Sequence, residues 1–280
     1  MSEPTTSIPL RPTGRRGPPE QQMQGHWLLA TLGKRVLRPG GLALTRRLLQ
    51  AAAPGAGDRI VEFGPGVGRT ATVLLAAEPT TYVAVDPNPE GSAALTAVLA
   101  RHPQARLEVR DAADTGLPTG QADLVVGEAM LSMHDQKTKD SIVAEAARLL
   151  GPGGRYAIHE LERIEDAGTR SGAPVGGPGD PVSREISRTI KVGARPLTLQ
   201  GWQTLLEAHG LEIVWTAHAP MRLLEPTRVF ADEGVIGATR FFVNVARNKP
   251  ARERVLAMRK SFRDNRAQLG AIAIVARRRA

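Results

Sequence analysis

The chain has 280 residues, of which 41% are hydrophobic, 23% charged and only 4% aromatic. This composition is typical of a folded globular protein, and the length suits one large domain with insertions. The absence of cysteine excludes disulfides, cysteine-ligated zinc and cysteine nucleophiles, including base methylation through a cysteine adduct. The few aromatic residues argue against a surface that binds nucleic acid by base stacking.

The net charge of +9 is unevenly distributed along the chain. Residues 58–160 carry 14 acidic and 9 basic side chains, whereas both flanks are basic. A basic flank attracts nucleic acid, an anionic substrate or a membrane surface, although solvated arginine-rich helices explain it more simply. No apolar stretch is long enough to cross a bilayer and no apolar leader segment occurs, so we expect a soluble, cytoplasmic protein.

The region before the first strand predicts an arm followed by a cap. Residues 1–22 are rich in proline and arginine, and we expect them to be disordered. Residues 23–57 show apolar residues at spacings of three and four, interrupted by the "RPGG" of residues 38–41. This pattern predicts an N-terminal helical cap of two helices.

From Arg59 onward, short apolar strands alternate with helices. The strands are expected at 59–64, 81–86, 106–111, 123–128 and 155–160, with helices at 69–78, 90–102 and 137–150. Alternation of this kind predicts a parallel sheet that is covered on both faces and connected by right-handed crossovers.

The remainder of the chain predicts a cover, a helix and a helical insertion between two strands. Residues 163–181 are rich in glycine and proline, and we expect them to form a mobile cover over the site. A helix at 199–210 is followed by strands at 211–218 and 271–278. The basic segment at about 222–268 is expected to insert a hairpin of two helices, 232–248 and 250–268, between those strands, within a domain that spans 58–280.

The glycine loop after the first strand carries the main functional signal. A dinucleotide-binding turn runs G-x-G-x-x-G, but here Gly64, Gly66 and Gly68 run G-x-G-x-G, and Arg69 occupies the position of the third glycine. Glu62 precedes the loop by two residues. A carboxylate is unfavourable beside a pyrophosphate and favourable beside a cation. S-adenosylmethionine (SAM) carries a sulfonium and an ammonium and has no phosphate.

On these residues, the sequence resembles the class I SAM-dependent methyltransferases, whose first motif is E/D-x-G-x-G-x-G. The resemblance implies an α/β, Rossmann-like sheet of seven strands with helices on both faces, an N-terminal helical cap and a helical insertion before the last strand. It also implies that Asp86 binds the ribose hydroxyls and that Asp111 lies near the adenine, with Ala112 stacked nearby. The residues expected to bind SAM and its product S-adenosylhomocysteine are Glu62, Gly64, Pro65, Gly66, Gly68, Asp86, Pro87, Asp111, Ala112 and Glu128.

Two further stretches support the resemblance. "LPTGQADLVV" is similar to the family's entry into the fourth strand, with Ala122 where an aromatic residue is common. "LLGPGGRYAIHE" is similar to its turn into the fifth strand. The resemblance is close over residues 58–160, and beyond Leu199 it extends only to the order of the elements.

Methyl transfer requires alignment of a nucleophile with the methyl carbon, and a base only where the acceptor loses a proton. Candidate catalytic residues are His134, Glu160 and His159. The imidazole of His134 titrates near neutral pH, but a surface histidine beside a helix start at Asp135 explains it equally well. His159 and Glu160 are adjacent on a strand and point to opposite faces, so we expect one of them to reach the cavity.

Four further residues are expected near the acceptor. His26 and Trp27 lie on a helix that covers the cofactor in many relatives, and Met130 and Met133 follow the fourth strand. Core packing is the alternative role for Trp27 and for both methionines.

The sequence excludes some classes of methyl acceptor. "GEAM" at 127–130 replaces the motif of exocyclic-amine DNA methyltransferases, and no carboxylate cluster predicts a metal site. Together with a general resemblance to small-molecule members of the family, this elimination favours methylation of an O or N atom of a small-molecule metabolite, by a monomer or a homodimer. The alternatives are an RNA methyltransferase that uses the basic flanks, a non-catalytic SAM-binding dimerisation module, and a lipid methyltransferase docked through residues 250–268.

Overall fold

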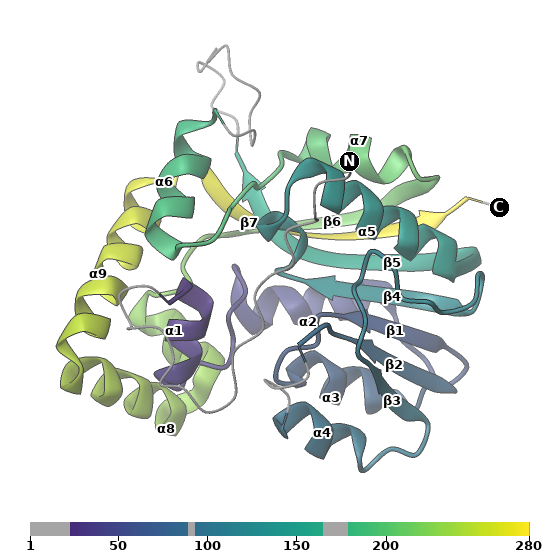
Figure 1. Ribbon diagram of the computed structural model, residues 1–280, viewed down its shortest axis with the longest axis horizontal. Coiled ribbons are helices and arrows are strands. Elements are labelled where there is room, and N and C mark those ends of the chain that lie inside the picture. Colours follow the sequence, from purple (N-terminus) through teal and green to yellow (C-terminus); the bar gives the residue numbers. More distant parts are fainter. Residues whose placement is uncertain (1–22, 89–92, 165–178, 280) are drawn as a thin grey trace, which may run out of the picture.

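The computed structural model describes residues 23–88, 93–164 and 179–279 (Figure 1). The expected arm at 1–22 and most of the expected cover at 163–181 lie outside these residues. Among the described helices, none combines the length and hydrophobicity needed to cross a bilayer.

The described elements alternate as the sequence predicts. They are α1 (Gly25–Thr31), α2 (Gly41–Ala52), β1 (Arg59–Phe63), α3 (Arg69–Leu75), β2 (Thr81–Val85), α4 (Ala93–Leu99), β3 (Ala105–Glu108), β4 (Ala122–Glu128), the 3-10 helix η2 (Leu131–Met133), α5 (Gln136–Leu149), β5 (Leu150–Arg163), α6 (Pro181–Ile190), α7 (Leu199–Glu207), β6 (Leu211–Pro220), α8 (Pro226–Arg247), α9 (Lys249–Asp264) and β7 (Leu269–Arg278).

The strands form one seven-stranded sheet in the order β3-β2-β1-β4-β5-β7-β6. The first five strands pair in parallel, and β7 runs antiparallel between β5 and β6. Chain order reverses between β1 and β4, so the sheet has its topological switch point there. Ligands of open α/β sheets bind outside the carboxyl ends of the strands at such a point.

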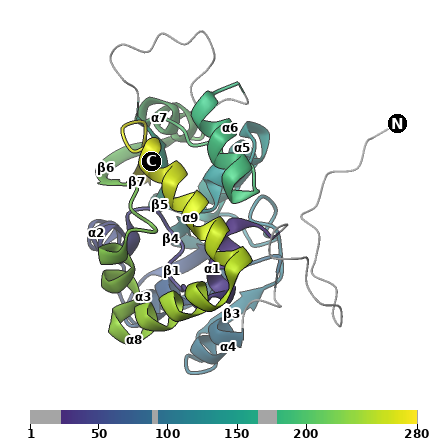
Figure 2. The same ribbon diagram turned by 90° about the vertical axis from the view of Figure 1, so that its left-hand side faces the viewer.

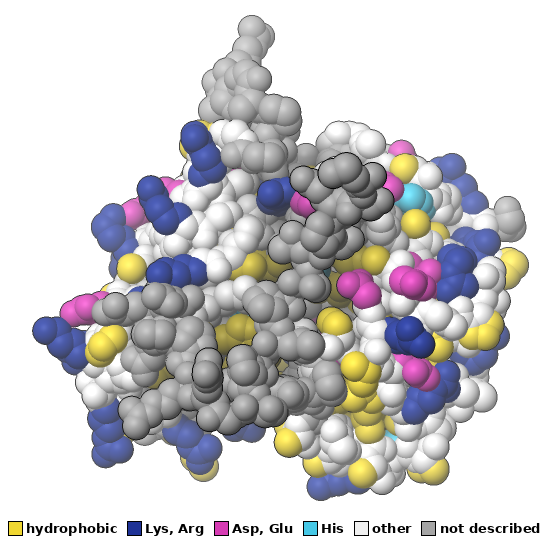
Figure 3. Space-filling model, in the orientation of Figure 1, with side chains coloured by type: hydrophobic (Ala, Val, Ile, Leu, Met, Phe, Trp, Pro, Cys, Tyr) yellow, Lys and Arg dark blue, Asp and Glu magenta, His cyan; other side chains and the backbone are white. Residues whose placement is uncertain are grey.

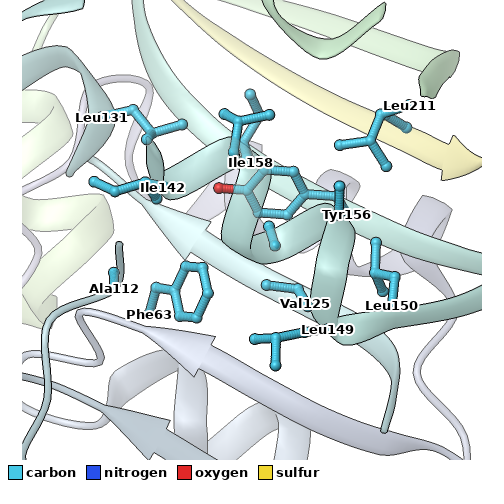
Figure 4. Close-up of a cluster of buried hydrophobic side chains, with 14 of the residues drawn as sticks. Phe63, Ala112, Val125, Leu131, Ile142, Leu149, Leu150, Tyr156, Ile158 and Leu211 are labelled. Atoms are coloured by element: carbon cyan, nitrogen blue, oxygen red, sulfur yellow. The ribbon is translucent and has the colours of Figure 1, made fainter. Parts of the chain in front are cut away.

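Each central strand is buried on both faces, which explains why it reads as a continuous apolar run. In β1, Val61 and Phe63 face the core under α5 and α7, and Ile60 faces the core under α2, α3 and α4. Figure 4 shows the first of these cores, in which Tyr156 of β5 lies among aliphatic side chains. Both cores hold the strand ends in place.

A second group of helices lies at one end of the sheet. Helices α1, α6, α8 and α9 enclose a separate apolar core that also includes Leu161 and Leu269 from the sheet. Figures 1 and 2 both show α1 beside the hairpin of α8 and α9. The expected helical insertion before the last strand is thus confirmed, as is the seven-stranded fold.

Three details differ from the sequence expectations. Helix α6 was not predicted, although Asp180 accepts a hydrogen bond from the Ser183 N–H and Pro181 begins the helix. Helix α8 begins earlier than expected, at Pro226, and breaks at Gly234, whose φ is 71°. Strand β3 ends at Glu108, before it reaches Asp111.

Two acidic residues beside the break in α8 bind the insertion to the segment between α1 and α2 and to the first turn of α2. The Glu233 carboxylate accepts the N–H groups of Arg35 and Val36 at 2.9 and 2.8 Å, and the Lys34 ammonium lies 3.6 Å away. Asp232 accepts the N–H of Leu42 at 3.0 Å. Glu233 and Lys34 have side chains with no exposed area, so the insertion and the cap share one buried polar contact.

We predict that Glu233→Ala lowers the free energy of unfolding by about 3 kcal/mol, because it leaves two N–H groups and an ammonium buried without an acceptor. Chemical denaturation measures this. Glu253→Ala, at an exposed position on α9, is the control and should change stability by less than about 0.5 kcal/mol. Equal stability of the two variants would contradict the assigned role of Glu233.

Candidate active site at the carboxyl edge of the sheet

The glycine loop between β1 and α3 is open where a ligand would lie. Gly64 and Gly66 have φ values of 60° and 55°, a region that favours glycine. A Cβ built on Gly66 meets no atom within 4 Å, and one on Gly64 meets only Met130, with its sulfur at 3.9 Å. The backbone therefore faces free space at both positions.

Gly68 has a different role from the one expected. It caps α3 with φ 78°, but its Cβ would lie 3.2 Å from Leu95 and 3.5 Å from Val98, both on α4. This glycine permits two helices to pack closely. The sequence motif treats three glycines alike, whereas the structure opens only the first two toward the site.

The three motif carboxylates lie at successive strand ends on the same edge. Glu62 in β1 is buried and accepts a hydrogen bond from Tyr82 of β2. Burial raises the pKa of Glu62 to about 7, although Tyr82 and Arg38 oppose the shift. Asp86 directly follows β2 and accepts the N–H of Asn88 at 2.8 Å, and burial raises its pKa.

The third carboxylate lies in a turn beyond β3. Asp111 is exposed and accepts the N–H of Ala113 at 2.8 Å. Its neighbour Ala112 is buried in the core with Phe63, as Figure 4 shows, so its side chain serves the core. Of the two prolines expected near the cofactor, Pro65 is buried and Pro87 is exposed.

Glu128 at the end of β4 is the hub of a buried polar cluster and is not a free ligand. Its carboxylate pairs with the Arg38 guanidinium and accepts the Thr70 hydroxyl. The Thr45 hydroxyl lies 2.6 Å from Glu128 Oε1 and 3.3 Å from His159 Nδ1, so it donates to one of them at a time. The cluster joins the cap, the start of α3 and two central strands.

His159, expected as a catalytic candidate, is a buried member of the same cluster. Its ring is fully buried, and Nε2–H donates to the carbonyl of Pro39. Burial lowers the pKa of His159 to about 3, with Arg38 acting in the same direction. A ring so enclosed positions the segment before α2 and is not open to an acceptor.

Glu160, the adjacent candidate, points to the opposite face as expected, but its carboxylate is saturated. It accepts the N–H groups of Met130, Leu131 and Ser132 at 3.0, 2.8 and 3.0 Å and the Ser132 hydroxyl at 2.7 Å. Burial raises the pKa of Glu160. Its role in the structure is to hold the turn after β4, so a catalytic assignment has no geometric support.

His134 follows η2 and makes no side-chain hydrogen bond to a described residue. Burial lowers the pKa of His134, and Asp111 opposes the shift through its charge. The ring therefore lies within electrostatic reach of the third carboxylate. Asp135 beside it caps α5 by accepting the Thr138 N–H, as the alternative interpretation expected.

An apolar pocket adjoins the ends of β4 and β5. The space not filled by protein atoms in and around it is about 590 Å³, part of which is open solvent. His26 and Met133 line it, whereas Trp27 is 45% exposed and contacts the His26 ring at a centroid distance of 5.2 Å. The other lining residues are Gly25, Leu29, Leu37, Pro39, Ala129, Glu160, Leu161, Ile186, Ile190, Val192, Met221, Leu223, Met258 and Phe262.

Met130 is half-buried between the glycine loop and β4. Its sulfur lies 3.4 Å from a Cβ built on Gly127 as well as near Gly64. The two methionines expected at the acceptor site thus separate, with Met130 beside the glycine loop and Met133 in the apolar pocket.

A family model described as a methyltransferase domain matches residues 60–154. These residues contain the glycine loop, the carboxylates at the strand ends and the turn after β4. Residues 60–154 therefore form a methyltransferase domain, within a fold of the class I SAM-dependent type. SAM is accordingly its methyl donor, as the sequence predicts.

Two related proteins match different lengths of this chain. An uncharacterized protein of Haemophilus influenzae is 29% identical over 253 residues, which cover 89% of this chain and 96% of that protein. Ribosomal RNA small subunit methyltransferase A of Methylobacterium radiotolerans is 44% identical, but over only 71 residues, 25% of this chain and 24% of that protein.

Solved structures share the fold of the methyltransferase over most of its length. The [4+2]-cyclase SpnF superposes with a TM-score of 0.66 at 19% identity and covers 94% of this chain and 98% of its own. A second structure is that of Phospholethanolamine N-methyltransferase 2 of Haemonchus contortus in complex with phosphomonomethylethanolamine and S-adenosylhomocysteine. It superposes with a TM-score of 0.67 at 16% identity and covers 91% of this chain and 58% of its own.

The carboxyl edge of the methyltransferase fits SAM on two observations. The free space over Gly64 and Gly66 is the space that a Cβ would fill. The carboxylates of Glu62, in β1, and Asp86, directly after β2, lie at this edge, where the ammonium and the ribose diol of SAM need acceptors. No group of three metal-binding side chains occurs among the described residues.

The sequence missed the buried polar cluster around the site. Arg38, Thr45 and Thr70 were assigned no role, and Glu128 was expected to bind the cofactor. Charged and hydroxyl residues of this kind are usually exposed, so a single sequence gives no signal that these are buried. Only the fold brings them together with His159.

We predict that Gly66→Ala weakens SAM binding at least tenfold, because the added Cβ occupies the space over the loop. Gly153→Ala is a matched control, since Gly153 also has positive φ, at 72°, and free space around its Cβ. Both variants should lose about 1 kcal/mol of stability through backbone strain, but only the first should lose affinity in calorimetric titration. Equal SAM affinity in both would contradict the site.

We predict that SAM binding to the empty protein releases a proton from Glu62. With a pKa of about 7, this carboxyl is mostly protonated at pH 5.5, whereas a bound ammonium favours its ionised form. Affinity should therefore fall on the order of tenfold from pH 7 to pH 5.5. Titration in buffers of different ionisation enthalpy measures the proton, and Glu62→Gln should abolish its release. Proton release that persists in that variant would assign it to another group.

Proposed function

We propose that the protein transfers the methyl group of SAM to an O or N atom of a small-molecule metabolite. The observation that supports this most strongly is the apolar pocket beside the ends of β4 and β5. It lies between the sheet and the helices α1, α6 and α9, and such enclosed apolar sites suit small ligands.

The residues around the site have different roles in this reaction. SAM, which supplies a methyl group activated by its sulfonium, is bound by the open loop at Gly64 and Gly66 and by three carboxylates, those of Glu62, Asp86 and Asp111. The Glu128 cluster and Glu160 fix the turns around the site, so the acceptor meets a rigid wall. Alignment and exclusion of water contribute effective molarities of roughly 10⁵–10⁸ M in well-oriented reactions.

A proton acceptor is needed where the nucleophile is a hydroxyl or an ammonium. The sequence offers three candidate bases. Among them, only the side chain of His134 makes no hydrogen bond to a described residue. Because burial lowers its pKa, its ring is neutral at pH 7 and able to take a proton. We retain His134 as the candidate base, on the side of the site where the charge of Asp111 acts on its ring.

Ribosomal RNA is the second candidate acceptor, favoured by the short match to a ribosomal RNA methyltransferase. That activity requires a basic surface around the site. In Figure 3, Lys and Arg side chains are spread over both halves of the visible face and do not gather in one patch. The enclosed pocket and this spread favour the small molecule.

The test is a labelling experiment with radioactive methyl-SAM. The protein is incubated with a low-molecular-weight metabolite extract or, separately, with ribosomal RNA and ribosomal subunits. We expect label in the small-molecule fraction, and at least tenfold less when Gly66→Ala replaces the wild type at a SAM concentration below its dissociation constant. Label that appears only in RNA would overturn the proposal in favour of the second candidate.

A further inference from the structure

The charges in the wall of the apolar pocket restrict the acceptor. Of the sixteen described residues that line it, only His26 and Glu160 have ionisable side chains. These sixteen include neither Lys nor Arg, so an anionic acceptor would meet no counter-ion among them. Both oxygens of Glu160 already accept two hydrogen bonds each. An entering cation would therefore have to compete with four donors for the one carboxylate of this wall.

Desolvation makes this restriction strong. The transfer of an ion out of water without a partner is strongly unfavourable, whereas the burial of apolar surface is favourable. The pocket offers three methionines and Phe262 as adaptable apolar contacts. It therefore selects for an uncharged, largely apolar molecule.

One polar group in the wall is still available. The His26 ring makes no hydrogen bond to any residue that the structure describes, and its aromatic contact with Trp27 leaves the ring nitrogens uncommitted. Burial is the cause that lowers the pKa of His26, so the ring is neutral at pH 7. A neutral imidazole has one nitrogen that accepts and one that donates.

We propose that the acceptor is an uncharged, largely apolar molecule whose hydroxyl donates a hydrogen bond to His26. This rests on the proposed function, since it names the acceptor class of that same site. His26 acts here as a specificity-determining residue, because an apolar molecule without the hydroxyl leaves its accepting nitrogen unpaired.

The test measures binding and needs no turnover. Four probes are compared by equilibrium dialysis at pH 7 with protein saturated with S-adenosylhomocysteine: 1-naphthol, naphthalene, 1-naphthoate and 1-naphthylmethylammonium. We expect 1-naphthol to bind at least tenfold more tightly than either charged probe. It should also bind roughly fivefold more tightly than naphthalene.

Four variants test whether the hydroxyl of the probe contacts His26 and whether the probes bind in the apolar pocket. His26→Phe should bring 1-naphthol to the affinity of naphthalene and leave naphthalene unchanged, whereas His102→Phe, in the turn before β3, should change neither. Met133→Lys should weaken both neutral probes at least tenfold, and Leu256→Lys, on the exposed side of α9, should not. Thermal unfolding confirms that each variant is folded.

Three results would overturn the proposal. They are tighter binding of a charged probe, failure of both neutral probes to bind, and an unchanged preference for naphthol over naphthalene in His26→Phe. The same dialysis measures S-adenosylhomocysteine itself. If the protein does not bind S-adenosylhomocysteine, the proposed function is refuted. If it binds S-adenosylhomocysteine but prefers the wrong probe, only the acceptor class is refuted.

Discussion

The parallel pairing of β2, β1, β4 and β5 is the constraint on which the site depends. Because parallel strands end at one edge, the fold brings Glu62, Asp86 and Glu128 together although they are far apart in the sequence. Two apolar cores, one on each face of the sheet, hold that edge in register. At the centre of this edge, Gly64 and Gly66 have positive φ and carry no Cβ, so the space over the loop is open.

A buried polar cluster ties this edge to the rest of the molecule. Arg38 from the cap meets Glu128 from β4, and His159 from β5 reaches the carbonyl of Pro39. Asp232 and Glu233 extend the same connection into the insertion. A buried charge that lacks a partner costs free energy. The cap, the sheet and the insertion therefore keep one arrangement only while every partner in the cluster is present.

This arrangement gives the two sides of the site different chemistry. The side toward the glycine loop is acidic and suits a cationic cofactor. The side toward α6 and α9 is apolar, with Met133, Met258 and Phe262 in its wall. Such a division is what the proposed binding of a charged donor and an apolar acceptor at one edge of the sheet requires.

Much of this could be predicted from the sequence, because periodicity and motif spacing are local signals. The alternation of strands and helices, the glycine loop and the acid after β2 are all read within short windows. The roles of His159, Glu160 and Gly68 could not be read in this way. Each depends on a partner on a different element of the fold, such as Leu95 for Gly68 or Pro39 for His159. Helix α6 escaped prediction for a similar reason, because its apolar face has a partner only where α9 and α1 pack against it.

The most direct measurement is a crystal structure of the protein with S-adenosylhomocysteine. The account predicts density for the nucleoside over Gly64 and Gly66, with its ribose hydroxyls within hydrogen-bond distance of Asp86 and its amino group beside Glu62. Density at any other part of the molecule, or a ribose that does not contact Asp86, would contradict it.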